Sequence, residues 1–200
     1  MPVIIIPAAQ LKTSTWAGGT TTELCIFPKG SVYQERNFDV RVSSARVDLD
    51  QSDFTSLPGY SRYIMPLVGA LELGHDGHDG AKLVPYQVHR FEGAWKTSSE
   101  GQCTDFNLMV GHGWAGEMRA VAYDEHCECA VSQLLCAYVL APCVLRIAED
   151  TVQRSPVMPG DVIAIYPSSN AYSFTLEPVG EVILGESDVL AVMARAWVGG

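Results

Sequence analysis

The sequence predicts an all-β protein, built as a sandwich or barrel of short strands. Short apolar segments recur along the chain and are separated by Gly, Pro, Asn or Asp. The 200 residues include 18 Gly and 11 Pro, which is a turn-rich composition, and 48% of them are hydrophobic. No stretch of about twelve residues carries an apolar stripe at helical spacing; residues 188–197 are the one candidate for a helix.

The strands are predicted in chain order from alternation and from the turn residues between them. The first is expected at residues 3–6, where Pro2 and Pro7 enclose a run of β-branched side chains. The others are expected at residues 24–27, 38–47, 62–68, 70–73, 87–91, 104–110, 118–123, 134–141, 144–149, 161–166, 171–176 and 181–185. Many short strands with tight turns are typical of sandwiches and barrels.

Net charge and apolar run length exclude two classes of partner. The formal net charge is −10, with nine Arg and four Lys, so no basic stripe is available for nucleic acid or an anionic membrane surface. The apolar runs are shorter than the roughly 20 residues that span a bilayer. The first residues lack the basic start of a secretory signal, so we expect a cytoplasmic protein.

Six cysteines do not require disulfides in a chain long enough to form its own core. Most lie in apolar, strand-like segments and are expected to be reduced, buried thiols. The segment "HCEC" at 126–129 is the one spacing that could hold a soft metal. Zinc sites usually add a second ligand pair further along the chain, and none is evident, so no metal or cofactor is predicted.

The segment "CTDFNLM" at 103–109 has one polar and one apolar face when it is read as a strand. Alternation places Asp105, Asn107 and Met109 together, opposite Phe106 and Leu108. A water-facing strand would explain this pattern, and so would the wall of a small barrel whose polar interior lines a cavity. We predict the second arrangement.

Two arginines share this pattern. In the strand at 38–47, Arg41 and Ser43 alternate with Val40 and Val42, and Arg62 opens the next strand after the turn "PGYS". Arginine is preferred where a planar guanidinium group must form two parallel hydrogen bonds with a carboxylate or phosphate. The alternative is that these arginines form structural ion pairs within the protein.

In "VMPGDVIAIYPSSNAYSF" (157–174) a Pro-Gly-Asp turn leads into a strand and then a proline turn. This pattern resembles a motif of the cupin superfamily, with Tyr172 where that superfamily has a histidine. Segments 57–78 and 138–150 are weakly alike. The resemblance implies a bicupin, which is two fused double-stranded β-helix (jelly-roll-like) barrels. We place the first at residues 1–122 and the second, degenerate one at 123–200, packed as one compact unit.

Four segments together resemble the HutD/Ves family: "WAGGTTTEL" (16–24), "FDVRVSSARVD" (38–48), "FTSLPGYSRYIMPLVGALEL" (54–73) and "FEGAWKTSSEGQCTDFNLM" (91–109). They occur in the family's order and span about half of the chain, from residue 16 to residue 109. The resemblance implies a bicupin linked to histidine utilisation. It implies binding of an acidic pathway intermediate such as formylglutamate, and it brings no catalytic activity.

The sequence departs from the family pattern after Trp16. Relatives usually carry Asn-Gly-Gly followed by Thr-Arg-Glu, whereas this chain has Gly18 and Gly19 followed by three threonines and Glu23. The asparagine and the arginine of the family pattern are therefore absent from this chain. If these two side chains contact ligand in relatives, this protein recognises its ligand differently or binds another one. Trp16 itself is expected to plug one barrel end rather than cap the cavity.

The predicted function is therefore non-enzymatic binding of a small anionic ligand, a carboxylate, for sensing or sequestration. The predicted ligand-binding residues are Arg41, Arg62, Asp105, Asn107, Thr21, Thr22, Glu23 and Ser43. Two alternatives stay open: a cupin lyase, isomerase or hydrolase that uses Asp105 or Glu23 as a base, and an interaction module with a vestigial pocket. The sequence does not decide between a monomer and a homodimer.

The histidines do not predict a metal site. Gly69 and His75 match the opening G-x₅-H of the cupin metal motif, but His78 follows at the wrong spacing. The surrounding "HDGHDG" has the composition of an exposed turn, and a catalytic metal centre needs several converging ligands. We also find no nucleophile elbow, so no catalytic residue is predicted.

Overall fold

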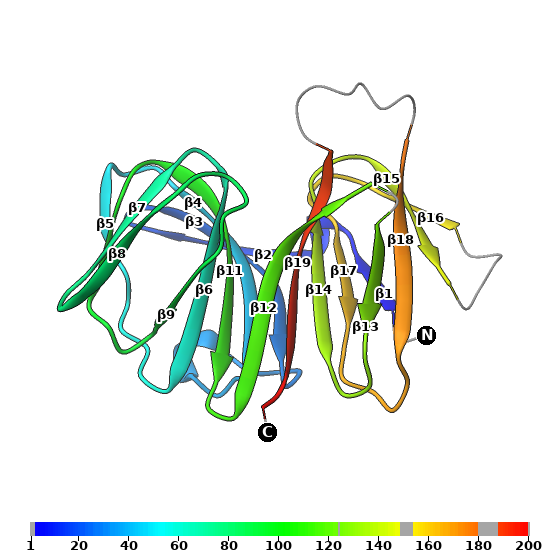
Figure 1. Ribbon diagram of the computed structural model, residues 1–200, viewed down its shortest axis with the longest axis horizontal. Helices are drawn as coiled ribbons and strands as arrows, with labels where there is room; N and C mark the ends of the chain where they lie inside the picture. The colour runs from blue at the N-terminus through cyan, green and yellow to red at the C-terminus, as the bar shows by residue number, and fades with distance from the viewer. Residues whose placement is uncertain (1–2, 124, 149–153, 180–187, 200) are drawn as a thin grey trace. The chain divides into compact units, whose positions relative to one another are not determined.

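The computed structural model describes residues 3–123, 125–148, 154–179 and 188–199, and almost all of the elements in them are β-strands (Figure 1). The predicted all-β class is confirmed. The helical elements in these ranges are two single 3₁₀ turns, η1 (Ala8–Gln10) and η2 (Tyr33–Glu35). No helix of the described residues is long and apolar enough to cross a membrane.

The chain forms two compact units, which we call the 12–118 unit and the 119–198 unit. The first comprises Lys12–Met118 with Gly199–Gly200, and the second comprises Met1–Leu11 with Arg119–Val198. The opening strand, which we expected in the first barrel, therefore groups with the 119–198 unit, where Val3 pairs with Ile165.

The 12–118 unit consists of two sheets. The six-stranded sheet contains, in spatial order, β2 (Lys12–Trp16), β3 (Gly19–Phe27), β4 (Val40–Val47), β11 (Cys103–Gly111), β6 (Tyr60–Val68) and β9 (His89–Glu92). The four-stranded sheet contains β5 (Gln51–Asp53), β10 (Thr97–Glu100), β7 (Leu71–His75) and β8 (His78–Leu83). One buried cluster draws on both sheets, because Ile64 and Phe91 of the first pack with Leu73 and Leu83 of the second.

The 119–198 unit repeats this plan. Its five-stranded sheet contains β1 (Val3–Ile6), β17 (Val162–Ile165), β14 (Leu134–Val139), β19 (Val189–Val198) and β12 (Trp114–Ala122). The boundary between the two units falls within β12, after Met118. Its four-stranded sheet contains β13 (His126–Cys129), β18 (Tyr172–Pro178), β15 (Cys143–Ile147) and β16 (Arg154–Val157). A single core joins the two sheets, with Leu135 and Ile163 from the first against Leu145 and Phe174 from the second.

Each unit is thus a pair of facing antiparallel sheets, as the bicupin prediction requires. Within the described strands the hydrogen-bonded order defines four separate sheets, so neither unit is a fully closed barrel. The two facing sheets are nevertheless enough to enclose a core and to leave room for a cavity between a sheet face and its loops.

The helix considered for residues 188–197 is wrong. This segment is strand β19, between β14 and β12, and Ala191, Val192 and Ala194 are completely buried. A strand covered on both faces reads as a continuous apolar run, because neither side needs polar residues. Periodicity alone cannot distinguish such a run from a buried helix.

Several strands escaped prediction because they are short and polar. Strands β2, β5, β8, β13 and β16 lie at sheet edges, and all five residues of β2 are exposed. Edge strands of this kind carry few apolar residues, so they lack the extended apolar alternation by which strands are recognised; in β13 only Cys127 and Cys129 are buried. The strand predicted at 181–185 lies outside the described residues.

Gly19, where β3 begins, is expected to tolerate no side chain. Its φ is +150°, and a Cβ would lie 1.9 Å from the backbone oxygen of Arg46 on the neighbouring strand. We expect Gly19→Ala to lower the free energy of unfolding by about 2 kcal/mol or more. Gly18→Ala is the matched control, because its Cβ would meet only the exposed ring of Trp16, which can turn away. Urea denaturation of both variants checks this; equal losses would contradict it.

Candidate functional site

The 12–118 unit contains a cavity of about 600 Å³. Its floor is the polar face of β3, β4, β6 and β11, and its rim is formed by β2 and by the segments around residues 31–34 and 52–55. The side chains used below are Trp16, Thr21, Glu23, Tyr33, Arg41, Ser43, Phe54, Arg62, Asp105, Asn107 and Met109. A cavity of this size suits a small organic ligand.

Sheet register brings the polar residues together. Across β4, β11 and β6, Arg41 pairs with Met109, which in turn pairs with Arg62. One row further along, Ser43 pairs with Asn107. Residues directly opposite on antiparallel strands point to the same face, so two guanidinium groups and an amide come from adjacent strands. Phe106 and Leu108, on the other face of β11, are completely buried.

Arg41 is held by a protein carboxylate. Its Nε lies 3.0 Å from Oε2 of Glu23, and its Nη1 donates to Oγ of Ser43 at 3.2 Å. The guanidinium carbon also lies 4.4 Å from the centre of the Tyr33 ring, in a cation–π arrangement. The structural ion pair considered from the sequence is therefore present at Arg41.

Arg62 is buried without a carboxylate partner. It is 7% exposed, and its guanidinium carbon lies 4.7 Å from the Phe54 ring centre and 5.3 Å from that of Phe91. Nη1 donates to the backbone oxygen of Thr55 at 3.2 Å, and within the described part of the chain no ion pair is formed by this side chain. Burial lowers the pKa of Arg62 to about 10. The charge of Asp105 acts in the opposite direction without forming an ion pair. A buried cation that lacks a direct ion-pair partner favours binding of an anion.

Asp105 is the second unusual group in the cavity. Its Oδ1 accepts hydrogen bonds from the backbone N–H of Ala45 at 3.2 Å and from the amide of Asn107. Burial raises the pKa of Asp105 to about 7, although both hydrogen bonds and the positive charge of Arg62 act in the opposite direction. At neutral pH the carboxyl group is therefore divided between its two protonation states.

The structure places seven of the eight predicted residues on the cavity: Thr21, Glu23, Arg41, Ser43, Arg62, Asp105 and Asn107. Thr22 is not among the lining residues. It alternates with Thr21 and Glu23 along β3, and its hydroxyl lies 2.8 Å from that of Thr13 on β2. The polar face of β11 faces this cavity, as alternation predicts.

Sequence reasoning missed the aromatic contribution. Tyr33 and Phe54 stack on the two arginines but come from turns and connecting segments, where no periodicity indicates which way a side chain points. Trp16, expected as a barrel plug, instead lines the cavity and is 37% exposed. An aromatic residue close to an arginine-bearing strand is too common a signal to have identified them.

The expectation of an exposed turn is wrong for His75. It is 5% exposed because Leu71, Leu73 and His75 form the inward face of β7, and only Asp76 and Gly77 form the turn. Its Nε2 lies 3.0 Å from Nε2 of His89, and its Nδ1 lies 2.9 Å from the Thr97 hydroxyl. Burial lowers the pKa of His75, so the neutral imidazole is favoured.

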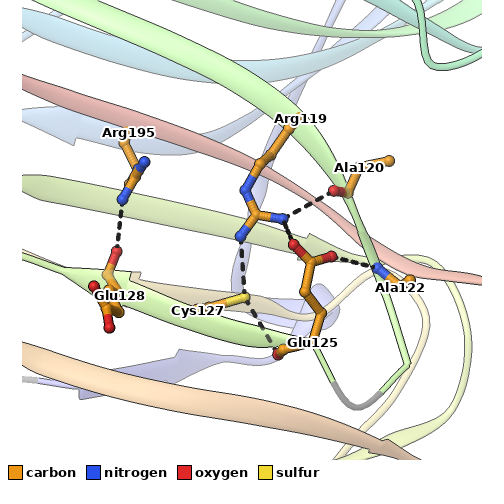
Figure 2. Close-up of polar contacts among 7 residues, drawn as sticks. All are labelled: Arg119, Ala120, Ala122, Glu125, Cys127, Glu128 and Arg195. Carbon is orange, nitrogen blue, oxygen red and sulfur yellow. Dashed lines mark hydrogen bonds and ion pairs between the residues drawn. The ribbon is translucent and has the colours of Figure 1, made fainter.

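No three metal-ligating side chains converge in the described ranges of the chain. In the "HCEC" segment, alternation along β13 buries Cys127 and Cys129 and exposes His126 and Glu128 on the opposite face. Figure 2 shows Cys127 beside Arg119, whose Nη2 lies 3.7 Å from the sulfur and whose Nη1 pairs with Glu125.

The described cysteines are buried and unoxidised. All six side chains are buried and none is in a disulfide bond, as the sequence predicts for Cys25, Cys103, Cys136 and Cys143. Cys103 is the first residue of β11. Burial raises the pKa of its thiol to about 12, and the negative charge of Asp105 also raises it. A thiol that stays protonated is a poor nucleophile.

Comparison with known proteins gives a family match and solved structures of the same fold. The model of the HutD family matches residues 8–184. A conserved protein of unknown function from Pseudomonas aeruginosa PAO1 has a TM-score of 0.78 at 19% identity over 99% of both chains. HutD from Pseudomonas fluorescens SBW25, solved in a formate condition, has a TM-score of 0.75 at 18% identity over 99% of this chain and 100% of that one.

A more distant likeness is to the bacterial pirin YhhW from Escherichia coli, solved in complex with nickel(II). Its TM-score is 0.63 at 8% identity, over 99% of this chain and 100% of the pirin. At such identities the likeness concerns the fold alone. The curated proteins contain no match.

Proposed function

Because the chain belongs to the HutD family, we propose that it is a non-enzymatic bicupin that binds a small acidic metabolite and so takes part in regulating histidine utilisation. The observation that carries this proposal is Arg62, a buried guanidinium that faces a cavity and forms no ion pair within the described residues. A carboxylate that accepts two hydrogen bonds from it would compensate the buried charge.

The groups around Arg62 fit an acylated amino acid. Asn107 uses its amide N–H on Asp105, which leaves its oxygen to accept from a ligand N–H. Ser43 accepts from Arg41 and keeps its own hydroxyl proton for a ligand carbonyl. A carboxylate next to an amide, as in N-formyl-L-glutamate, presents this combination of groups.

Isothermal titration with N-formyl-L-glutamate and with L-glutamate tests the proposal. We expect a dissociation constant for the formylated compound in the micromolar to millimolar range, about −8 to −4 kcal/mol. L-Glutamate should bind at least about tenfold more weakly, because its ammonium group would approach two guanidinium groups. Equal affinities, or no heat from either compound, would contradict the proposal.

Glu23 is expected to limit affinity, because it already occupies Arg41. In Glu23→Gln the guanidinium keeps Ser43 and Tyr33 but loses its carboxylate. We therefore expect N-formyl-L-glutamate to bind about three- to tenfold more tightly, a gain of about 1 kcal/mol. Titration of the variant provides the measurement. Weaker binding would mean that Glu23 orients Arg41 for the ligand instead of competing with it.

A second candidate is a cupin enzyme with Asp105 as general base. The observation in its favour is a buried cavity carboxyl whose pKa is raised to about 7 by burial, as general bases often show. NMR spectra of N-formyl-L-glutamate incubated with the protein decide the matter. New resonances that require Asp105 would support the enzyme, and an unchanged spectrum would favour binding alone.

We also propose that the protein works in the cytoplasm. Six buried cysteines, none of them in a disulfide bond, fit a reducing compartment. Growth of cells followed by fractionation and immunodetection checks this location.

A further inference from the structure

The two oxygens of Asp105 have different surroundings. Oδ1 accepts both of the protein's hydrogen bonds to this carboxyl group, from Ala45 and Asn107. Oδ2 has no hydrogen-bond partner among the described residues. Every fully buried side-chain oxygen among the described residues has a hydrogen-bond partner. Since Oδ2 has none, it is not fully buried, and it is reached from the cavity that Asp105 lines. A bound ligand would therefore meet Oδ2.

The charged and titratable groups on the cavity come from every neighbouring element. They are Lys12 of β2, Glu23 of β3, Tyr33 of η2, Arg41 of β4, Asp53 of β5 and Arg62 of β6. Arg41 is already neutralised by Glu23. Arg62 is therefore the principal buried positive charge that favours ionised Asp105, and it is also the group that an incoming anion would occupy.

We propose that anion binding in this cavity is coupled to the uptake of one proton by Asp105, whose Oδ2–H then donates a hydrogen bond to the bound carboxylate. This deepens and rests on the proposed function. An anion on Arg62 removes the attraction that keeps Asp105 ionised and adds a repulsive like charge. The proton comes from the buffer and no covalent bond other than the new O–H forms. The charge of the protein side of the site rises by one, which offsets one negative charge of the bound carboxylate.

The coupling makes binding depend on pH. Below about pH 6 the carboxyl group is already protonated, so affinity should not change with pH. Above about pH 7 each pH unit should weaken binding by up to tenfold, with uptake approaching one proton per anion. Asp105→Asn carries an N–H in place of the acid proton, and we expect it to show no proton uptake and no pH dependence, whatever its affinity.

Titration calorimetry with N-formyl-L-glutamate at pH 6, 7 and 8, in buffers of different ionisation enthalpy, measures the uptake directly. Asp76→Asn is the matched control, because Asp76 is an exposed aspartate of the same unit outside the cavity lining. It should keep the wild-type uptake. Binding at pH 8 without proton uptake would overturn the coupling and leave the proposed function standing.

A second measurement keeps the inference testable if N-formyl-L-glutamate does not bind, which would count against the proposed function. Carbon-13 NMR of aspartate-labelled protein, assigned with Asp105→Asn, follows this carboxyl group with and without acetate. We expect titration near neutral pH that moves upward when acetate is added. A carboxyl group that titrates near the ordinary aspartate pKa of 3.8 and does not respond to acetate would overturn the coupling.

Discussion

Replacing Arg62 with methionine is expected to weaken binding of N-formyl-L-glutamate at least about a hundredfold. Two charged hydrogen bonds at about 1.5 kcal/mol or more each give roughly 3 kcal/mol. Methionine can still pack against Phe54 and Phe91, so the cavity keeps its apolar wall. The variant should fold normally, because the substitution removes a buried charge that has no ion-pair partner within the described chain.

The matched control is Arg90→Met. Arg90 lies on β9 of the same sheet, but it is exposed and paired with Glu92 at 2.8 Å. Its replacement should leave the dissociation constant unchanged. If Arg62→Met bound within about threefold of the wild-type protein while keeping its stability, the ligand would not be held by this guanidinium, and the site would have to be placed elsewhere.

The second large effect is expected for Asp105→Asn, measured as stability against pH. The carboxyl pKa is raised to about 7 in the folded protein, against about 3.9 in an unfolded chain. Between these values the native state binds more protons than the unfolded state, so stability falls as pH rises from about 4 to 7 and is constant above that range. Within this range each pH unit lowers the free energy of unfolding by about 1.4 kcal/mol at most.

Asparagine at this position can accept the same hydrogen bonds from Ala45 and Asn107, but it never ionises. The variant should match the wild-type protein near pH 4 and become more stable than it as the pH rises. By pH 8 the gain could reach an upper limit on the order of 4 kcal/mol. Urea denaturation of both proteins at pH 4, 6 and 8 measures it. A gap that is the same at every pH would show that Asp105 is not strained by burial.

The effects expected for Arg62→Met and Asp105→Asn have a common physical origin, which is the burial of charged groups in the cavity. Arg62 is a buried arginine without a carboxylate partner, and Asp105 is a buried carboxyl group that resists ionisation. Each of them lowers the stability of the ligand-free protein. A ligand anion with an uptake of one proton would relieve both. This is the expected trade-off between stability and a pre-organised binding site.

Sequence alone predicted most of the strands that have a buried face, but not β10, β13 or β19. Alternation in "CTDFNLM" correctly placed Asp105, Asn107 and Met109 on one face, because β11 is central in its sheet and both faces are constrained. The same rule, applied to β3, excludes Thr22, since Thr21 and Glu23 are its neighbours on either side. Alternation along the strand therefore distinguishes Thr22 from its two neighbours within the threonine run.

Other features could not be predicted because they depend on tertiary packing. The inward direction of His75 follows from the extension of β7 beyond Gly74, whereas its sequence context is typical of a turn. Tyr33 and Phe54 reach the arginines from non-strand segments. The pairing of Arg41 with Glu23, and not with Asp105, is decided by register: Glu23 lies opposite Ser43, beside Arg41 on the same face of β4.

The most direct test is a crystal structure of the protein grown with N-formyl-L-glutamate. It should show the ligand in the cavity of the 12–118 unit, with one carboxylate oxygen about 2.7–2.9 Å from a nitrogen of Arg62. The same carboxylate should lie within hydrogen-bond distance of Oδ2 of Asp105. A ligand bound at another place on the chain, with Arg62 untouched, would contradict the account.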